Sequence, residues 1–331
     1  MDDILSEIDQ GSVVSLVSLD ISTAFDTICH KIIIQRLEQE FGIVGTALQW
    51  FQSYLSDRTF SVRVGSTSSS PVPVSTGVPQ GSVLGPLLFT VYVSSIGRLI
   101  ESCHIGYHAY ADDTQLFTAL KTSVHDNIDR LVCCVEMLQT WLWHNGLLLN
   151  PDKSEVIFFG TRQRLHSTNL PTSISIAGNV ISVSSTVKIL GVKLDSTLSF
   201  SDHVNDVVRG CNYHMRALRH IRRYMSRDVA RSIAFSIVGS RLDYCNCLLY
   251  DMGTGLTNKL QHVQNNLARI VCDVQFKRRR GQRSSQELLQ ELHWLPVASR
   301  ISFKVALLCY KAYRLGEPAY LHTLTQPYMP T

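Results

Sequence analysis

The sequence feature that most constrains the fold is a short continuous apolar run near the N-terminus, VVSLVSL at residues 13–19. The run is rich in valine and lies between Gly11 and Asp20, which is typical of a strand buried within a sheet. Because the run stops at Asp20, the strand should carry a carboxylate at its end. The sequence therefore predicts a sheet-containing core with an acidic side chain at one end of a buried strand.

A β-hairpin is predicted for HIGYHAYADDTQLFTAL, residues 104–120. Its two short arms alternate around a polar centre, which puts Asp112 and Asp113 at the tip. If this hairpin pairs beside the 13–19 strand, Asp20 and Asp112 lie side by side. Taken singly, an Asp-Asp pair is often only a turn, and a carboxylate that ends a strand is often a helix cap.

The pattern changes near residue 200, from mixed helices and strands to helices alone. The predicted class is α+β over residues 1–200, followed by an all-α region over residues 201–331, and a chain of 331 residues is long enough for two domains. The individual predictions are helices at 23–40, 82–98 and 126–145, strands at 154–160 and 187–194, a loop at 66–73, and a hairpin at 174–183 that turns at Gly178 and Asn179.

Charge is distributed unevenly along the chain, although the net charge is only +4. Residues 1–150 carry 7 Lys and Arg against 15 Asp and Glu, whereas residues 151–331 carry 24 against 12. A basic second half favours a polyanion as partner, and an acidic first half suits a metal-dependent site. Two independently solvated surfaces would give the same counts.

Composition excludes two broad classes of protein. An apolar fraction of 45% argues against intrinsic disorder. No apolar run approaches the roughly 18 residues that span a bilayer, and the N-terminus lacks the apolar segment of a signal peptide. We therefore expect a globular chain without a membrane partner.

Asp20, Asp112 and Asp113 are candidate metal ligands. Clustered carboxylates repel one another, so such a site is stable mainly when divalent cations are bound. Their oxygen atoms suit Mg²⁺, with Mn²⁺ as an alternative. Two such ions about 4 Å apart would stabilise the attacking and leaving oxygens of an in-line phosphoryl displacement.

Five segments in a fixed order carry a family resemblance. They resemble palm motifs A to E of the reverse transcriptase family, most closely those of non-LTR, LINE-like retrotransposons of the Jockey-related group. The segments are LVSLDISTAFDT (16–27), STGVPQGSVLGPLLF (75–89), YADD (110–113), GLLLNPDKSEVIFFG (146–160) and VKILGVKLD (187–195). The resemblance continues through RLDYCNCLLY (241–250), LHWLPV (292–297) and PAYLHTLTQPYMP (318–330), so it covers nearly the whole chain.

The resemblance implies a polymerase palm over residues 1–200, an antiparallel sheet with packed helices, followed by an all-α thumb and a C-terminal helical region over residues 201–331. It implies an RNA-directed DNA polymerase that extends a DNA primer on an RNA template with dNTPs and two Mg²⁺ ions. It also implies an intracellular protein, nuclear or cytoplasmic, and leaves protein partners unassigned.

Individual residues match the family motifs. Asp20 matches the motif A ligand that serves both ions, and Asp112 and Asp113 match the paired aspartates of motif C, with Asp112 favoured for direct ligation. Phe25 matches the aromatic side chain that stacks under the incoming sugar and rejects a 2′-hydroxyl, although it would also suit a core position. Lys153, expected in a loop, matches the motif D lysine that protonates the leaving pyrophosphate.

Two turns and a basic run complete the resemblance. Gln80 and Gly81 match the motif B turn at the nucleotide and template, where glycine allows a close backbone approach. Leu190 and Gly191 match the motif E turn that grips the primer. The run KRRRGQR, residues 277–283, should contact the nucleic-acid backbone through Lys and Arg, or act as a nuclear localisation signal. Its first four residues are Lys277, Arg278, Arg279 and Arg280.

The segment ahead of motif A departs from the family. Relatives carry a fingers subdomain and an endonuclease domain there, whereas 19 residues precede Asp20 in this sequence. We therefore expect a truncated open reading frame that retains the palm residues but lacks the clamp for the triphosphate. The alternative is a catalytically inactive remnant that only binds nucleic acid, and metal-dependent nucleotide incorporation separates the two.

Overall fold

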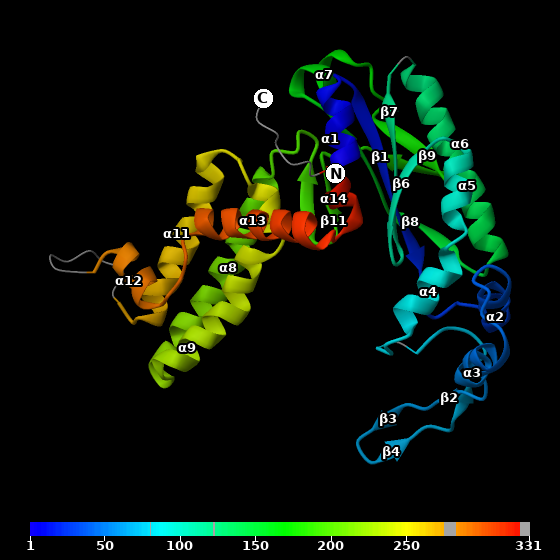
Figure 1. The fold of residues 1–331 in the computed structure, drawn as a ribbon, viewed down its shortest axis with the longest axis horizontal. Helices are drawn as coiled ribbons and strands as arrows, with labels where there is room; N and C mark the ends of the chain where they lie inside the picture. Colours follow the sequence, from blue (N-terminus) through cyan, green and yellow to red (C-terminus); the bar gives the residue numbers. More distant parts are fainter. Residues whose placement is uncertain (80, 122, 275–282, 325–331) are drawn as a thin grey trace. The chain divides into compact units, whose positions relative to one another are not determined.

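The computed structural model describes residues 1–79, 81–121, 123–274 and 283–324. The chain divides into two compact units (Figure 1). The first contains residues 1–187 and 196–198, and the second contains residues 188–195 and 199–331. Within the described residues, no helix is both long enough and apolar enough to cross a membrane.

A four-stranded antiparallel sheet forms the centre of the first unit (Figure 1), in the order β6-β7-β1-β8. Strand β1 is buried between two neighbours, as its continuous apolar run predicts, and Val14 and Val17 are inaccessible to solvent. The strand continues past Asp20, so this carboxylate lies within β1 and not at its end. The strands are β1 (Val13–Ser22), β6 (Gly106–Tyr110), β7 (Asp113–Leu120) and β8 (Leu148–Phe159).

Helices cover this sheet. Helices α5 and α6 pack against each other and against β6 and β7. The Ser123 hydroxyl caps α6 by accepting a hydrogen bond from the backbone N–H of Asp126. The helices of this unit are α1 (Asp2–Asp9), α2 (His30–Gln39), α3 (Gly45–Leu55), α4 (Gly85–Val93), α5 (Ile96–Ser102), α6 (Val124–His144) and α7 (Arg162–Ser167). The α+β class is confirmed.

Two helix predictions were wrong in their bounds. The helix predicted at 23–40 begins only at His30, because the carbonyls of Phe25 and Ile28 accept hydrogen bonds from residues 78 and 77 and leave the helical pattern. The helix predicted at 82–98 is two helices, α4 and α5. Helix α4 starts at Gly85, whose N–H bonds to the Ser82 hydroxyl.

Two further predictions missed a tight turn, and a third, the hairpin at 174–183, is confirmed with its turn displaced by one residue. The loop predicted at 66–73 belongs to a hairpin that turns at Gly65, with a φ of +61°. The strand predicted at 187–194 is a hairpin that turns at Leu190 and Gly191, and the hairpin at 174–183 turns one residue earlier than expected. The strands are β2 (Thr59–Phe60), β3 (Arg63–Val64), β4 (Thr67–Ser68), β5 (Val72–Pro73), β9 (Ser173–Ile176), β10 (Asn179–Ser182), β11 (Thr186–Ile189) and β12 (Val192–Asp195).

The second unit is helical apart from the hairpin residues 188–195. Its core forms where α8 packs against α11. The buried residues of α8 recur at helical spacing, at Val204, Cys211, Met215 and Leu218. The elements are α8 (Ser201–Ile221), η1 (Arg222–Tyr224), α9 (Arg227–Ala234), the π-helix η2 (Phe235–Gly239), α10 (Ser240–Asp243), η3 (Asn246–Leu249), α11 (Thr254–Val271), α12 (Ser285–Glu291), α13 (Val297–Leu315) and α14 (Ala319–Leu324).

Candidate active site

A bulge in β8 brings two side chains to Asp20. Residue 18 of β1 lies opposite residue 155 of β8, but Asp20 lies opposite Asn150, so residues 151–154 leave the ladder. The Ser154 hydroxyl closes this bulge by donating to the Asn150 carbonyl over 2.8 Å. Bulges of this kind re-aim side chains and are common beside active sites.

Two donors reach the same oxygen of Asp20. The Asn150 amide donates a hydrogen bond of 3.1 Å to Asp20 Oδ2, and Lys153 Nζ lies 3.7 Å from that atom. Lys153 was expected in a loop; it lies instead within β8, in the bulge, and remains largely exposed. Asn150 was not singled out from the sequence, because only the strand pairing shows that it faces Asp20.

The β6–β7 hairpin carries the other two aspartates to the same end of the sheet. Tyr110 pairs with Asp113, so Ala111 and Asp112 form the turn, and Ala111 has a φ of +54°. In the β1–β7 ladder, Leu19 pairs with Thr114, which makes Asp113 the next residue toward Asp20. The predicted hairpin and its pairing beside β1 are confirmed.

Asp113 senses the charges of the other two carboxylates. Burial raises the pKa of Asp113, and the charges of Asp112 and Asp20 raise it further. Neutralising such a cluster requires protons or cations. The arrangement therefore concentrates negative charge where β1, β7 and the bulge of β8 meet.

The donor set suits a divalent cation, although it does not form a complete protein cage. In the part of the chain that the structure describes, no three His, Cys, Asp or Glu side chains are gathered closely enough to hold a metal ion. Mg²⁺ is usually held by one or two carboxylates together with water and substrate phosphates. Asp20, Asp112 and Asp113 fit that pattern, because they are hard oxygen ligands that repel one another.

Hydrogen bonds connect motif B to residues 25–30, which follow Asp20 in the chain. The N–H of Gly77 donates to the Ile28 carbonyl over 2.7 Å, and the N–H of Val78 donates to the Phe25 carbonyl over 2.9 Å. The His30 ring bonds to the Gly77 carbonyl at 2.7 Å. Gly77 and His30 were missed in the sequence, where Gln80 and Gly81 were assigned to this motif. The available signal was a second glycine three residues before Gln80.

Phe25 and Gly81 occupy different environments. Phe25 is half-buried, and its ring packs against Phe89 with centroids 4.8 Å apart, so it has a packing role beside any contact with substrate. Gly81 is exposed, with a φ of +80° and open space where a Cβ would lie. Gln80 lies outside the described residues.

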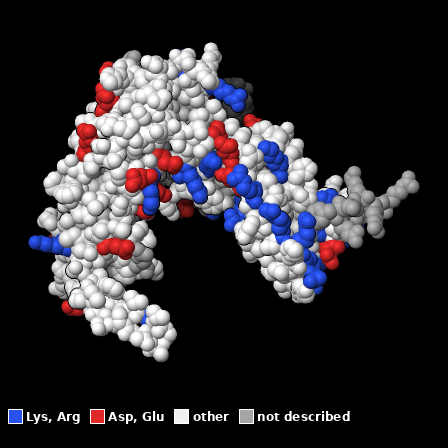
Figure 2. All heavy atoms as spheres, turned by 180° about the vertical axis from the view of Figure 1, so that it is seen from behind, with Lys and Arg blue, Asp and Glu red and all other residues white. Residues whose placement is uncertain are grey.

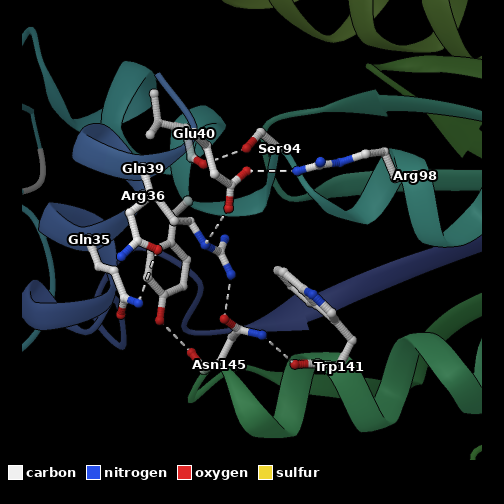
Figure 3. Close-up of polar contacts among 10 residues, drawn as sticks. Gln35, Arg36, Gln39, Glu40, Ser94, Arg98, Trp141 and Asn145 are labelled. Atoms are coloured by element: carbon white, nitrogen blue, oxygen red, sulfur yellow. Dashed lines mark hydrogen bonds and ion pairs between the residues drawn. The ribbon is translucent and has the colours of Figure 1, made fainter. Parts of the chain in front are cut away.

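A buried polar cluster lies among α2, α4 and the C-terminal end of α6 (Figure 3). The Arg36 guanidinium donates to Asn145 Oδ1 and lies 4.9 Å from the ring centroids of both Tyr92 and Trp141. The Tyr92 hydroxyl donates to the Asn145 carbonyl over 2.5 Å and accepts from the N–H of Cys29 over 3.3 Å. Burial lowers the pKa of Arg36. The cluster connects α2, α4 and the C-terminal end of α6.

A cavity of about 610 Å³ borders the junction of motifs A and B. His30, Arg58 and Thr76 are among its lining residues, and the Arg58 guanidinium lies 4.7 Å from the ring centroid of Tyr54. Residues 58–100 carry three arginines and no Asp or Glu, in a half of the chain that is otherwise acidic. Residues 58–100 are therefore better suited to lie beside a polyanion than the other residues of the acidic half are.

The motif E turn belongs to the second unit. Leu190 and Gly191 both have positive φ, +46° and +82°, as a two-residue hairpin turn requires. The Tyr244 hydroxyl donates to the Leu190 carbonyl, and the backbone N–H of Lys193 donates to His203 Nδ1 over 3.3 Å. Because His203 Nδ1 accepts this hydrogen bond, that nitrogen carries no proton and the ring is neutral.

We expect the stability of the second unit to fall as the pH drops below about 6.5. Burial lowers the pKa of His203, although Asp206 opposes the shift. His203 therefore binds a proton more readily in the unfolded chain than in the folded one, so acid favours unfolding. For one such group, the free energy of unfolding falls by at most about 1.4 kcal/mol per pH unit.

Denaturant unfolding between pH 5 and pH 8 measures this dependence, with His203→Gln expected to flatten it. A matched control is His220→Gln, at an exposed position of the same helix. An unchanged pH dependence in His203→Gln would show that another group is responsible.

The basic residues of the second unit divide into two groups. Arg222 donates to the Val271 carbonyl over 3.1 and 2.8 Å, and Arg227 pairs with Glu291 at 2.5 Å, so these two arginines hold the unit together. Figure 2 shows basic side chains in a band on this unit. A cavity of about 430 Å³ in this unit is lined by Arg209, Asn212, Met215, Arg216, Arg219 and Asn266. Lys277, Arg278, Arg279 and Arg280 lie outside the described residues.

The class of protein comes from family comparison. Residues 3–194 match the family described as reverse transcriptase (RNA-dependent DNA polymerase). The chain therefore belongs to the reverse transcriptase family. Members of this family act on nucleic acid and generally use divalent metal ions.

Its relatives come from non-LTR retrotransposons. The chain is 29% identical to the probable RNA-directed DNA polymerase from transposon BS of Drosophila melanogaster, over 82% of this chain and 30% of that protein. It is 30% identical to the RNA-directed DNA polymerase from mobile element jockey of the same species, over 57% of this chain and 20% of that protein. The chain thus spans less than a third of these curated relatives.

A solved structure of apo telomerase from Candida tropicalis is also similar. The similarity covers 96% of this chain and 54% of that chain, with a TM-score of 0.47 and 12% identity. These values are too low to support a conclusion.

Proposed function

We propose that this chain catalyses RNA-directed DNA synthesis, with residues 1–200 as the palm and residues 201–331 as the thumb and C-terminal region. The substrates would be an RNA template, a DNA primer and dNTPs. One observation carries the proposal: Asp20, Asp112 and Asp113 meet at one end of the sheet, where the β8 bulge delivers Lys153 to Asp20. An acidic cluster beside an exposed ammonium group suits phosphoryl transfer.

Each candidate catalytic residue of the first unit would have a defined role in the reaction. Asp20 would hold both Mg²⁺ ions, or Mn²⁺ in their place, with Asp112 and Asp113 as the further carboxylate ligands. When bound, the ions supply positive charge to the attacking and leaving oxygens. Lys153 would hold a proton at Nζ and transfer it to the leaving pyrophosphate. Its exposure leaves Nζ accessible to substrate.

The remaining candidate residues would contact the primer, the template and the incoming nucleotide. Phe25 would face the incoming sugar, and Gln80 and Gly81 would lie at the nucleotide and template. Leu190 and Gly191 would grip the primer. Phosphate contacts would come from the basic run, Lys277, Arg278, Arg279 and Arg280.

Replacing Phe25 by alanine should raise the preference for ribonucleotides, measured as the rNTP to dNTP ratio of kcat/KM, by about tenfold or more. Removal of the ring would admit the 2′-hydroxyl that it excludes. Because Phe25 packs against Phe89, the substitution also leaves a void. Phe89→Leu is therefore the control, since it disturbs the same packing from the other side. An rNTP to dNTP ratio that stays at the wild-type value in Phe25→Ala would leave Phe25 with its packing role alone.

Primer extension tests the proposed function. The purified chain, an RNA template annealed to a DNA primer, dNTPs and Mg²⁺ should yield extended primer, and Asp112→Ala should abolish the product. Nucleic-acid binding is measured on the same preparation. A folded, RNA-binding chain without extension would refute polymerase activity and favour the inactive remnant that only binds nucleic acid.

A further inference from the structure

A cavity in the second unit is built from segments that the palm chemistry leaves without a role. Its volume is about 310 Å³. The segment 241–250 contributes Asp243 and Asn246, and the segment 292–297 contributes Trp294. Helix α13 supplies Arg300 and Phe303. Two of the three sequence motifs that lie beyond the palm thus meet in one place.

One polar group of this cavity is buried without a partner. Asn246 is 4% exposed, and its Nδ2 donates to Asp243 Oδ1 over 3.4 Å, which fixes the orientation of the amide. The Oδ1 atom of Asn246 is buried and accepts no hydrogen bond from the described residues. Asp243 is held in turn by an ion pair with Arg300. Buried acceptors without a donor are costly and rare, so this one calls for an outside donor.

The other walls combine aromatic rings with positive charge. Phe303 and Phe235 are both exposed, at 62% and 49%. Phe235 belongs to the π-helix η2, a form of helix that often marks functional sites, and the Arg300 guanidinium lies 5.6 Å from its ring centroid. Trp294 and Lys304 complete the aromatic and cationic lining. Lys304 is exposed and free to meet an anion at the rim.

We propose that this cavity binds a nucleotide, either one unpaired nucleotide of a single strand or a free one. Proteins recognise unpaired bases by stacking them on aromatic side chains and bonding their edges with amides. Phe303 and Trp294 offer the stacking surfaces, the Asn246 amide offers an acceptor for a base N–H, and Lys304 offers a charge to the phosphate. The volume suits one nucleotide, since it lies at the lower end of small-ligand cavities. The site uses no palm carboxylate and goes beyond the polymerase function.

The test uses the full chain with EDTA, so that palm catalysis does not contribute. The probes are the four nucleoside monophosphates, titrated by calorimetry, and fluorescein-labelled eight-nucleotide RNAs, titrated by anisotropy. Phe303→Ala and Lys304→Gln should each weaken binding about tenfold. Tyr310→Ala and Lys311→Gln are matched controls, because both residues are exposed, seven positions further along α13 and outside the cavity lining.

A second readout locates the site directly. RNA that carries 5-iodouridine, irradiated on the chain, should crosslink to the peptide that contains Trp294 or Phe303. Asn246→Leu, which removes the unpaired oxygen together with the Nδ2 donor to Asp243, should lower affinity about tenfold, and a thermal melt of this variant checks that the chain stays folded.

The probes distinguish the two sources of the nucleotide, and both would support the site. Stronger binding of the RNAs than of the monophosphates indicates a strand, and equal binding indicates a free nucleotide. Cavity variants that bind like their matched controls, crosslinks confined to other peptides, or no binding of any probe would overturn the proposal. Asp20→Asn should not change these affinities, so the result does not depend on whether the chain polymerises.

Discussion

Replacing Asp20 by asparagine should lower the rate of nucleotide incorporation by at least about 1,000-fold, which corresponds to about 4 kcal/mol of transition-state stabilisation. Asparagine keeps the size of the side chain and can still accept from Asn150, but it lacks the charge that two cations would share. The fold should survive, because the ion pair with Lys153 is exposed and contributes little to stability. Single-turnover primer extension measures the rate.

The control for this substitution is Asp129→Asn, which removes an exposed carboxylate from α6 in the same unit. It separates loss of the site from a general change in charge. Wild-type incorporation by Asp20→Asn would remove Asp20 from the metal site and with it the assignment of motif A.

Replacing Gly77 by alanine should destabilise the first unit by about 3 kcal/mol or more and lower its melting temperature by about 6–12 °C. Gly77 has a φ of +84°, where a Cβ is strained, and that Cβ would lie 2.7 Å from the backbone oxygen of Asp26 and 2.9 Å from its Cα. Both obstacles are backbone atoms, so no side-chain rotation relieves them. Calorimetry or denaturant unfolding measures the loss.

Gly65→Ala is the matched control for Gly77→Ala. Gly65 also has a positive φ, +61°, but no heavy atom lies within 4 Å of the position of a Cβ. It should therefore cost only the backbone strain, about 1–2 kcal/mol. Equal losses in the two variants would show that the contact of motif B with motif A does not constrain the chain. Activity should fall further in Gly77→Ala than in Gly65→Ala, because the junction positions Phe25.

Local pattern was sufficient for the central sheet. The apolar run of β1 and the alternating arms of β6 and β7 depend on neighbours in the sequence, and they predicted the strand and the hairpin. The pairing of the hairpin with β1 joins distant segments and entered the sequence analysis only as a condition. The helices of the second unit were likewise visible from their period. Turns of two residues were harder, since Leu190 adopts a positive φ that its side chain does not favour.

The parts of the site that escaped prediction depend on contacts between distant segments. Asn150 acts on Asp20 across 130 positions, and Arg36 reaches Asn145 across 109. The β8 bulge has no signature of its own, because the register of β8 against β1 decides which residues leave the ladder. The helix predicted at 23–40 failed for the same reason: the hydrogen bonds of residues 25–28 go to motif B, fifty positions later.

The most direct test of the acidic site is incorporation of one complementary dNTP on an RNA template, followed as a function of Mg²⁺ concentration in the wild-type chain and in Asp20→Asn. Incorporation by the wild-type chain should rise with Mg²⁺, disappear with EDTA, and be lost in the variant at every Mg²⁺ concentration. Incorporation that persists in Asp20→Asn, or a folded wild-type chain that binds template and primer but incorporates nothing at any Mg²⁺ concentration, would contradict this prediction.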